Sequence, residues 1–286
     1  MKKKGQKSTI VLIAVLIAGL SLLLYPSVAN YWNSFHASRA ISSYSEEVAN
    51  LSREEYEAII NAARAYNEGL AMKAKGYALT DRQRDEYENL LDITGTGIMG
   101  EIDIPSIHVS LPIYHGTSDG VLQSAVGHLE WTSLPVGGKS SHCVLSGHRG
   151  LPSAKLFTHL DRLQEGDIFR LRILNEVLSY EVDQILIVEP ENTEPLQIVE
   201  GEDYCTLVTC TPYGINTHRL LVRGHRVEND VMADSLNISF DAIQIEPKLV
   251  ASIIAIPMLL VFVAVVSLRK RRTKTELELT RGEANE

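Results

Sequence analysis

The sequence has few cysteines and shows no paired cysteine or histidine spacing of the zinc type. We therefore expect no metal ion and no other cofactor. It also has no internal repeat and no low-complexity segment, which excludes the repeat architectures. Proline is absent between Pro26 and Pro105, so nothing in that stretch forbids long helices.

Basic residues are scarce in the middle of the chain. Residues 30–247 hold 32 of the 36 acidic residues but only 16 of the 27 basic ones, for a net charge of −16. An acidic domain argues against nucleic acid as a partner. Its charge fits a basic substrate, although acidic surfaces commonly serve solubility alone.

Two apolar runs, residues 10–24 and 249–268, predict the topology. The second is long enough to cross a bilayer as a helix, and basic residues follow it at 269–274. Lys2, Lys3, Lys4 and Lys7 precede the first run. The positive-inside rule therefore places both termini in the cytoplasm and the intervening chain outside the cell membrane.

The first apolar run is short and is followed by Ser27-Val28-Ala29, a triplet that signal peptidase accepts. Cleavage there stays open, but the middle of the chain lies outside in either case. We expect the following organisation: a basic and hydrophobic signal or anchor segment (1–29), a helical region (30–96), a catalytic domain (97–230), a linker (231–248), a transmembrane helix (249–268) and a cytoplasmic tail (269–286).

The helical region and the domain after it differ in the spacing of their apolar residues. Residues 46–66 carry apolar side chains near a 3.6-residue period, and a second helix is expected at 81–91 after the Thr80 cap. Beyond Gly95, short β-branched runs alternate with turn residues, which predicts a closed or nearly closed β-barrel of seven or eight strands. The runs are 99–104, 108–113, 142–146, 168–173, 178–189, 204–210 and 219–227.

Cys210 is the candidate nucleophile. The count of three cysteines is odd, so at least one thiol is free in an oxidising exterior. Pro212 and Gly214 end the strand just after Cys210, where a thiol is accessible. Arg219 begins the returning strand and is expected beside Cys210, where its guanidinium donors reach the carbonyl under attack. Arg223 has the same side-chain parity and is the second candidate for that role.

His148 is the candidate acid and base. It follows a predicted strand and stands between Gly147 and Gly150, so its position resembles that of Cys210. Position alone distinguishes it from the other histidines. Seven of these are expected to be surface or hydrogen-bonded structural residues. These are His108, His115, His128, His142, His159, His218 and His225.

Four blocks of this chain resemble the class C, pilin-polymerising sortases of Gram-positive bacteria. They are LPIYHGTS (111–118), SLPVGG (133–138), SGHRGLPS (146–153) and TLVTCTPYGINTHRLLVRG (206–224). The likeness covers roughly residues 97–227.

The resemblance implies a mainly β fold: an eight-stranded sortase barrel, preceded here by N-terminal helices and followed by a transmembrane helix. It implies catalytic roles for Cys210 as nucleophile, His148 as general acid and base, and Arg219 as the residue that orients substrate and stabilises the oxyanion. The implied substrates are pilins or surface proteins with a Leu-Pro-x-Thr-Gly-like sorting signal. They are cleaved after threonine and transferred to a pilin lysine.

The chain departs from that class in one respect. Such enzymes commonly carry an N-terminal lid with an Asp-Pro-aromatic motif, and no Asp-Pro pair occurs here. Residues 74–96 occupy the corresponding region, and a lid role for them stays open.

Cys143 and Cys205 each lie five residues before a candidate catalytic residue, so they face the opposite side of their strands. Core packing is expected for both. If the strands that carry them are adjacent and parallel, the two cysteines are neighbours, and a strained disulfide is conceivable.

Three other functions compete with pilin assembly. A sortase that anchors proteins to peptidoglycan has the same active-site residues. A hydrolytic cysteine protease requires water to compete for the thioacyl bond. A non-catalytic, membrane-anchored scaffold for pilins belongs to a different class and forms no adduct on Cys210.

Overall fold

The computed structural model describes residues 2–72 and 79–229, and the chain divides into two units. One unit comprises Met1–Ser27 and Ser235–Glu286, and the other comprises Val28–Asp234. The predicted linker, transmembrane helix and cytoplasmic tail at 231–286 lie outside the described residues. The segment 74–96, for which a lid role was left open, is described only from residue 79 onward.

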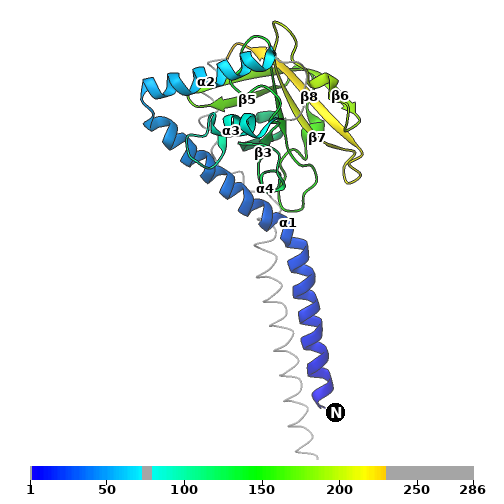
Figure 1. The fold of residues 1–286 in the computed structure, drawn as a ribbon. Coiled ribbons are helices and arrows are strands. Elements are labelled where there is room, and N and C mark those ends of the chain that lie inside the picture. Colours follow the sequence, from blue (N-terminus) through cyan, green and yellow to red (C-terminus); the bar gives the residue numbers. More distant parts are fainter. Residues whose placement is uncertain (1, 73–78, 230–286) are drawn as a thin grey trace, which may run out of the picture. The chain divides into compact units, whose positions relative to one another are not determined.

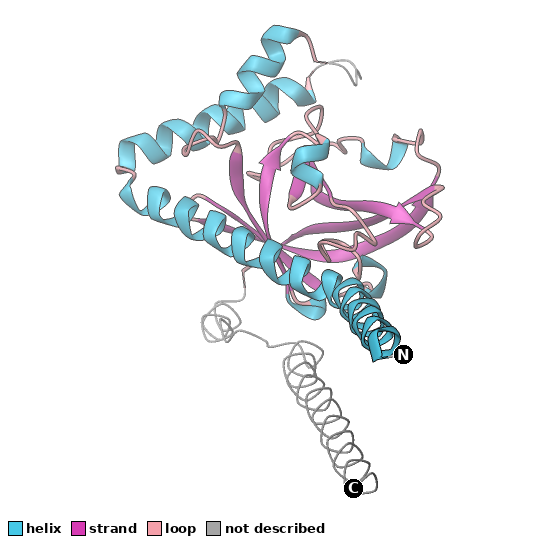
Figure 2. Ribbon diagram, turned by 90° about the horizontal axis from the view of Figure 1, so that it is seen from below, coloured by secondary structure: helices cyan, strands magenta, loops and turns pink. Residues whose placement is uncertain are grey.

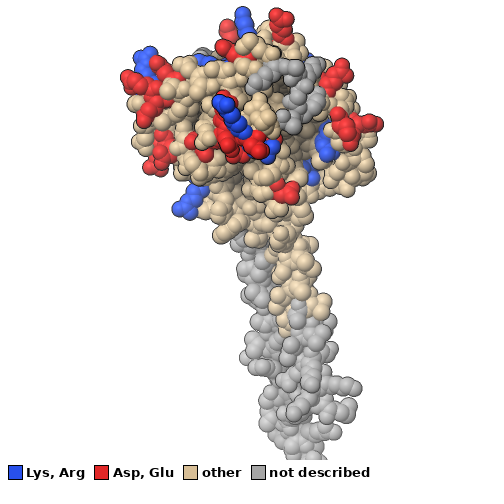
Figure 3. All heavy atoms as spheres, viewed as in Figure 1, with Lys and Arg blue, Asp and Glu red and all other residues tan. Residues whose placement is uncertain are grey.

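Helix α1 (Lys2–Asn50) runs through Pro26 and through the predicted boundary at residue 29 without a break. Its stretch Val15–Asn50 is long and apolar enough to span a membrane, by length and composition alone, and none of the apolar window is buried. No lysine, arginine, aspartate or glutamate occurs between Lys7 and Arg39. Between these two residues, the described part of α1 shows no charged side chain on the face seen in Figure 3.

The predicted single helix across residues 46–66 is wrong, because a helix start lies inside it. Helix α1 ends at Asn50 and α2 (Arg53–Ala71) begins after Ser52. The Ser52 hydroxyl accepts from the Glu55 amide at 3.2 Å, and the Glu55 carboxylate accepts from the Ser52 amide at 2.9 Å. This capping box satisfies amides that would have no partner inside the helix. The second half of α1 and α2 form a V along one side of the barrel (Figures 1 and 2).

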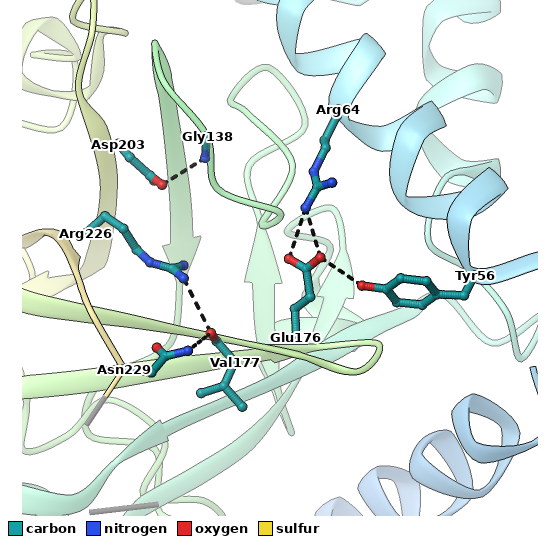
Figure 4. Close-up of polar contacts among 8 residues, drawn as sticks. All are labelled: Tyr56, Arg64, Gly138, Glu176, Val177, Asp203, Arg226 and Asn229. Atoms are coloured by element: carbon teal, nitrogen blue, oxygen red, sulfur yellow. Dashed lines mark hydrogen bonds and ion pairs between the residues drawn. The ribbon is translucent and has the colours of Figure 1, made fainter. Parts of the chain in front are cut away.

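Helix α2 is fixed to the barrel by polar contacts as well as by apolar packing. Tyr56 and Arg64 of α2 both bond the carboxylate of Glu176, at 2.8 and 2.9 Å (Figure 4). Asn67 pairs its side-chain amide with the buried backbone of Leu134 in both directions, at 2.7 and 3.0 Å. These contacts fix α2 to the barrel. Helix α3 (Asp81–Asn89) follows the Thr80 cap, as predicted.

Eight strands form a closed barrel in the order β1-β2-β3-β4-β7-β8-β6-β5, which confirms the predicted fold class. The strands β4 and β7 pair in parallel, and β7 and β8 are antiparallel. Strand β3, only three residues long, is absent from the predicted runs. The strands are β1 (Ile98–Ile104), β2 (Val109–His115), β3 (Val126–His128), β4 (Ser141–Ser146), β5 (Ile168–Ile173), β6 (Glu176–Val188), β7 (Asp203–Thr211) and β8 (His218–Val227).

Short helical turns connect these strands: η1 (Pro105–Ile107), α4 (Asp119–Leu122), η2 (Leu160–Arg162) and η3 (Glu194–Leu196). The main core fills the barrel and extends beneath the helices, from Tyr44 and Ile60 to Phe169 and Leu207. Burial of this surface is what fixes the strands in register. The barrel is therefore a rigid support for residues at its strand ends.

Candidate active site

Cys210 and Arg219 lie directly opposite each other at the adjoining ends of β7 and β8. Side chains of directly opposed residues in an antiparallel pair share one face of the sheet. Both residues are partly exposed, whereas their neighbours Thr209 and Leu220 are buried. The alternation places the thiol and the guanidinium on the outer face of the barrel.

The loop between β7 and β8 holds the guanidinium of Arg219. Its Nη1 donates to the carbonyl oxygens of Asn216 and His218, at 3.3 and 3.2 Å. Gly214 in this loop has a φ of 75°, a conformation that glycine adopts without strain. The sequence expectation that Cys210 ends a strand and that Arg219 returns beside it agrees with this geometry.

His148 reaches the same place from β4. Ser146, the last residue of β4, pairs with Val208 in the parallel β4–β7 ladder, two residues before His148 and Cys210 respectively. Two further bonds join the strands at this point: the Gly147 amide donates to the Val208 carbonyl at 3.1 Å, and the Thr209 hydroxyl donates to the Gly147 carbonyl at 2.7 Å. The three candidate residues thus lie at or just beyond the ends of three adjacent strands.

Sequence reasoning missed Thr209 and Phe157, which hydrogen-bond the backbone at Gly147 and His148. A side chain at Gly147 would lie 2.7 Å from the buried ring of Phe157, so glycine is required there. The amide of Phe157 in turn donates to the carbonyl of His148 at 3.1 Å. A signal in the sequence could have found Thr209. It precedes an outward-facing cysteine by one residue, so its side chain faces inward, and a buried hydroxyl needs a hydrogen-bond partner.

An apolar cluster lies on the same outer face as Cys210. Val208 precedes Cys210 by two residues and packs with Val144 and Leu221 from the flanking strands and with Leu196 of η3. Leu129, Trp131, Leu186 and Val188 pack around this cluster. The thiol therefore lies at the end of a buried apolar cluster that is separate from the barrel core.

Arg223, the second candidate for the arginine role, is engaged elsewhere. It lies opposite Thr206, and four residues of strand separate it from Arg219, which is about 13 Å. Its guanidinium makes two bonds to the carboxylate of Asp183, at 3.0 and 2.9 Å, and lies 4.2 Å from the Tyr204 ring centroid. The arrangement favours Arg219 beside the thiol.

Cys143 and Cys205 are neighbours across the parallel β4–β7 pair, as equal offsets predict. Both are buried and free of a disulfide, so they belong to the core. Burial raises the pKa of the Cys205 thiol well above its usual value, which suppresses the nucleophilic thiolate. Only Cys210 of the three is accessible.

Several other histidines have structural partners, in line with the expectation for them. His128 contacts the Tyr87 hydroxyl at 2.9 Å, and His142 contacts the Thr206 hydroxyl at 2.7 Å. His115 bonds the carbonyl oxygens of Leu90 and Gly97. Among the described residues, no group of three histidine, cysteine or carboxylate side chains is arranged to hold a metal ion.

The described part of the segment 74–96 packs on β2 and β3. Tyr87 of α3 is buried, and its hydroxyl contacts His128 and accepts from the Gly116 amide. Arg84 of the same helix pairs with Glu130 at 3.0 Å. These contacts fix α3 to the barrel wall.

Comparisons with known proteins agree with this geometry. Residues 102–227 match the model of the sortase domain. Crystal structures of sortase C1 from Streptococcus agalactiae and sortase C from Streptococcus pneumoniae are 54% and 46% identical, with TM-scores of 0.66 and 0.61. Each alignment covers 67% of this chain and 100% or 97% of the other chain, respectively.

Sortase C of Clostridium perfringens, solved with the C-terminal cell wall sorting motif, is 46% identical with a TM-score of 0.60. That alignment covers 68% of this chain and 100% of the other. Alignments with curated sortases span only 40–63% of those proteins' lengths.

A closed eight-stranded barrel with an accessible cysteine, a histidine and an arginine at three adjacent strand ends defines a class of cysteine-dependent enzymes. The chain belongs to the sortase family, whose members are cysteine transpeptidases. The solved structures that it resembles are class C sortases.

Proposed function

We propose that this protein is a membrane-anchored transpeptidase that joins pilin subunits. It cleaves a Leu-Pro-x-Thr-Gly-like sorting signal and transfers the acyl group to a lysine amine of the next pilin. The observation that carries this proposal is the pairing of Cys210 with Arg219 across β7 and β8, next to strand β4, which His148 follows.

In the first half-reaction the Cys210 thiolate attacks the carbonyl carbon of the threonine in the signal. The carbonyl oxygen becomes an oxyanion, which accepts hydrogen bonds from the guanidinium of Arg219. The carbon–nitrogen bond to glycine then breaks, and His148 donates a proton to the departing amine. The product is a thioester between Cys210 and the threonine.

In the second half-reaction the acceptor amine attacks the thioester carbonyl. His148, now neutral, takes a proton from the attacking nitrogen, and the Cys210 thiolate leaves. One amide bond is broken and one is formed, so the reaction needs neither a cofactor nor an external energy source.

Two considerations favour pilin lysine as the acceptor. The class C motifs surround all three proposed catalytic residues, and the neighbouring structure from Streptococcus pneumoniae is described in terms of pilin substrate specificity. The Clostridium perfringens neighbour, solved with a cell wall sorting motif, supports the signal itself as the donor. Anchoring of surface proteins to a peptidoglycan amine is the second candidate, since the chemistry at Cys210 is identical.

Membrane attachment rests on helix α1 and on the charge pattern of the termini. The candidate span Val15–Asn50 follows lysines at 2, 3, 4 and 7, which places its start in the cytoplasm. The barrel then lies outside the cell, where sorting signals and pilins are found. The apolar run at 249–268, a second proposed anchor, carries the same orientation.

A sorting-signal peptide tests the reaction directly. Incubated with the wild-type protein, it should leave an acyl adduct on Cys210 that mass spectrometry detects and that hydroxylamine removes. The Cys210→Ala variant should show no adduct, and Cys205→Ala should retain it. Competition between a pilin domain and a peptidoglycan-derived amine then identifies the acceptor. An unmodified Cys210 throughout would favour a non-catalytic scaffold.

A further inference from the structure

The connection that carries His148 is tied to the second half of helix α1. The carboxamide of Asn33 donates to the carbonyl of Ser153 at 2.9 Å, and the carboxamide oxygen of Asn30 accepts from the Lys155 amide at 2.9 Å. More than 100 residues separate each pair in the sequence. Both bonds lie within the unit Val28–Asp234.

A short series of hydrogen bonds continues from this contact to His148. The carbonyl of Lys155 accepts from the Thr158 amide at 2.8 Å, and the Thr158 hydroxyl accepts from the Gly150 amide at 3.1 Å. Phe157, inside the same turn, bonds the carbonyl of His148. Residues 153–158 are therefore joined to the histidine on one side and to α1 on the other.

The two asparagines occupy the face of α1 that meets the barrel. Asn30 and Asn33 continue, at helical spacing, the row of buried residues formed by Ala37, Tyr44 and Val48. The opposite face carries exposed apolar residues instead: Tyr25, Val28, Tyr31, Trp32 and Phe35. Polar side chains on the barrel-facing row need partners, and the backbone at Ser153 and Lys155 provides them.

We propose that Asn30 and Asn33 are positioning residues, which hold the connection after β4 so that His148 stays beside Cys210. Helix α1 thereby acts as part of the active-site support in addition to any role as an anchor. Asn33 follows the end of the apolar run at residue 24 by nine residues, or about 13 Å of helix. This inference rests on the proposed function only for the role of His148.

Replacing each asparagine by aspartate should have different effects at the two positions, because the two backbone partners differ. The Lys155 amide is a donor, so Asn30 uses its oxygen, and an aspartate there still accepts the bond. The Ser153 carbonyl is an acceptor, so Asn33 uses its nitrogen, and an aspartate there has nothing to donate. Asn30→Asp should therefore behave as wild type, whereas Asn33→Asp should behave as Asn33→Ala. Ser34→Ala is the matched control, because the Ser34 hydroxyl bonds only the Tyr31 carbonyl within α1.

The test uses the full-length chain in detergent and two independent readouts. In Asn30→Ala and Asn33→Ala, amide hydrogen exchange should accelerate by about three- to tenfold in residues 150–157, and the control should be unchanged. The kcat for cleavage of a sorting-signal peptide should fall by a similar factor with KM and melting temperature unchanged.

Unchanged exchange in the alanine variants would overturn the proposal, as would equal behaviour of the two aspartate variants. An equal loss of rate in Ser34→Ala would do the same. If the wild type cleaved no peptide at all, the proposed function would fail. The exchange measurement would still show whether Asn30 and Asn33 hold the connection after β4 in place.

Discussion

Replacing Arg219 by lysine tests whether the guanidinium itself is needed. Lysine keeps the positive charge but loses the planar fork of donors. In the structure, Nη1 of Arg219 is held by the carbonyls of Asn216 and His218. With this nitrogen fixed, Nε and Nη2 remain to bond the developing oxyanion. A lysine ammonium that takes the two carbonyls has no planar second donor for the substrate.

The expected loss follows from the removal of an oxyanion donor. Such a loss costs about 10²–10³ in kcat, or roughly 3–4 kcal/mol of transition-state stabilisation. The fall should appear in kcat and in kcat/KM equally, because the bond forms only in the transition state. The folded state should be little affected, since Arg219 is partly exposed and lies at a strand end.

Arg223→Lys is the matched control, measured with the same fluorogenic sorting-signal peptide and by thermal unfolding. This variant loses the two-bond contact with Asp183 and the stacking on Tyr204, so its melting temperature should fall by a few degrees. Its kcat should stay within about twofold of wild type. Near-wild-type turnover in Arg219→Lys, or a large loss confined to Arg223→Lys, would refute the assignment.

Four further predictions follow from the same geometry. Cys210→Ala should abolish cleavage and polymer formation with an unchanged melting curve, whereas Cys205→Ala should lower stability and keep activity; the reverse pattern would assign the nucleophile wrongly. His148→Ala should slow acylation by orders of magnitude with little change in melting temperature, and a purely structural residue would show the opposite. Protease added to intact protoplasts should remove the barrel, and protection of the barrel would reverse the topology. Burial lowers the pKa of His142 to about 4, so between pH 6.5 and 4 the unfolded chain binds a proton at His142 and the folded chain does not. The free energy of unfolding should therefore fall by up to about 3 kcal/mol over this range. In thermal unfolding at a series of pH values, His142→Gln should lose that part of the pH dependence.

The strand pattern was predictable because alternation and turn residues are local properties of the chain. Seven runs agree with strands of the barrel, and Pro212 and Gly214 mark where β7 gives way to a loop. Strand β3 was not predictable. Its three residues, Val126–His128, are too few for a period to appear, and it pairs only because β2 and β4 lie on either side of it.

The helix boundary at Ser52 shows a different limit. Apolar residues on both sides of it keep a helical period, so periodicity alone joins α1 to α2. The capping box formed by Ser52 and Glu55 was present in the sequence and marks the break. Here the local signal existed, and the longer-range pattern concealed it.

By itself, the sequence determined the chemistry available and the positions at which strands end. Cys210, Arg219 and His148 are recognisable because each stands at a strand end beside glycine, proline or a returning strand, which are features of neighbouring residues. Only the tertiary structure decided which strand ends meet. The parallel β4–β7 register aligns residue 148 with residue 210 across 62 positions of chain, and Thr209 and Gly147 fix that alignment. The contacts of Asn30 and Asn33 with residues 153–155 likewise depend on how the helices pack against the barrel, which no local pattern specifies.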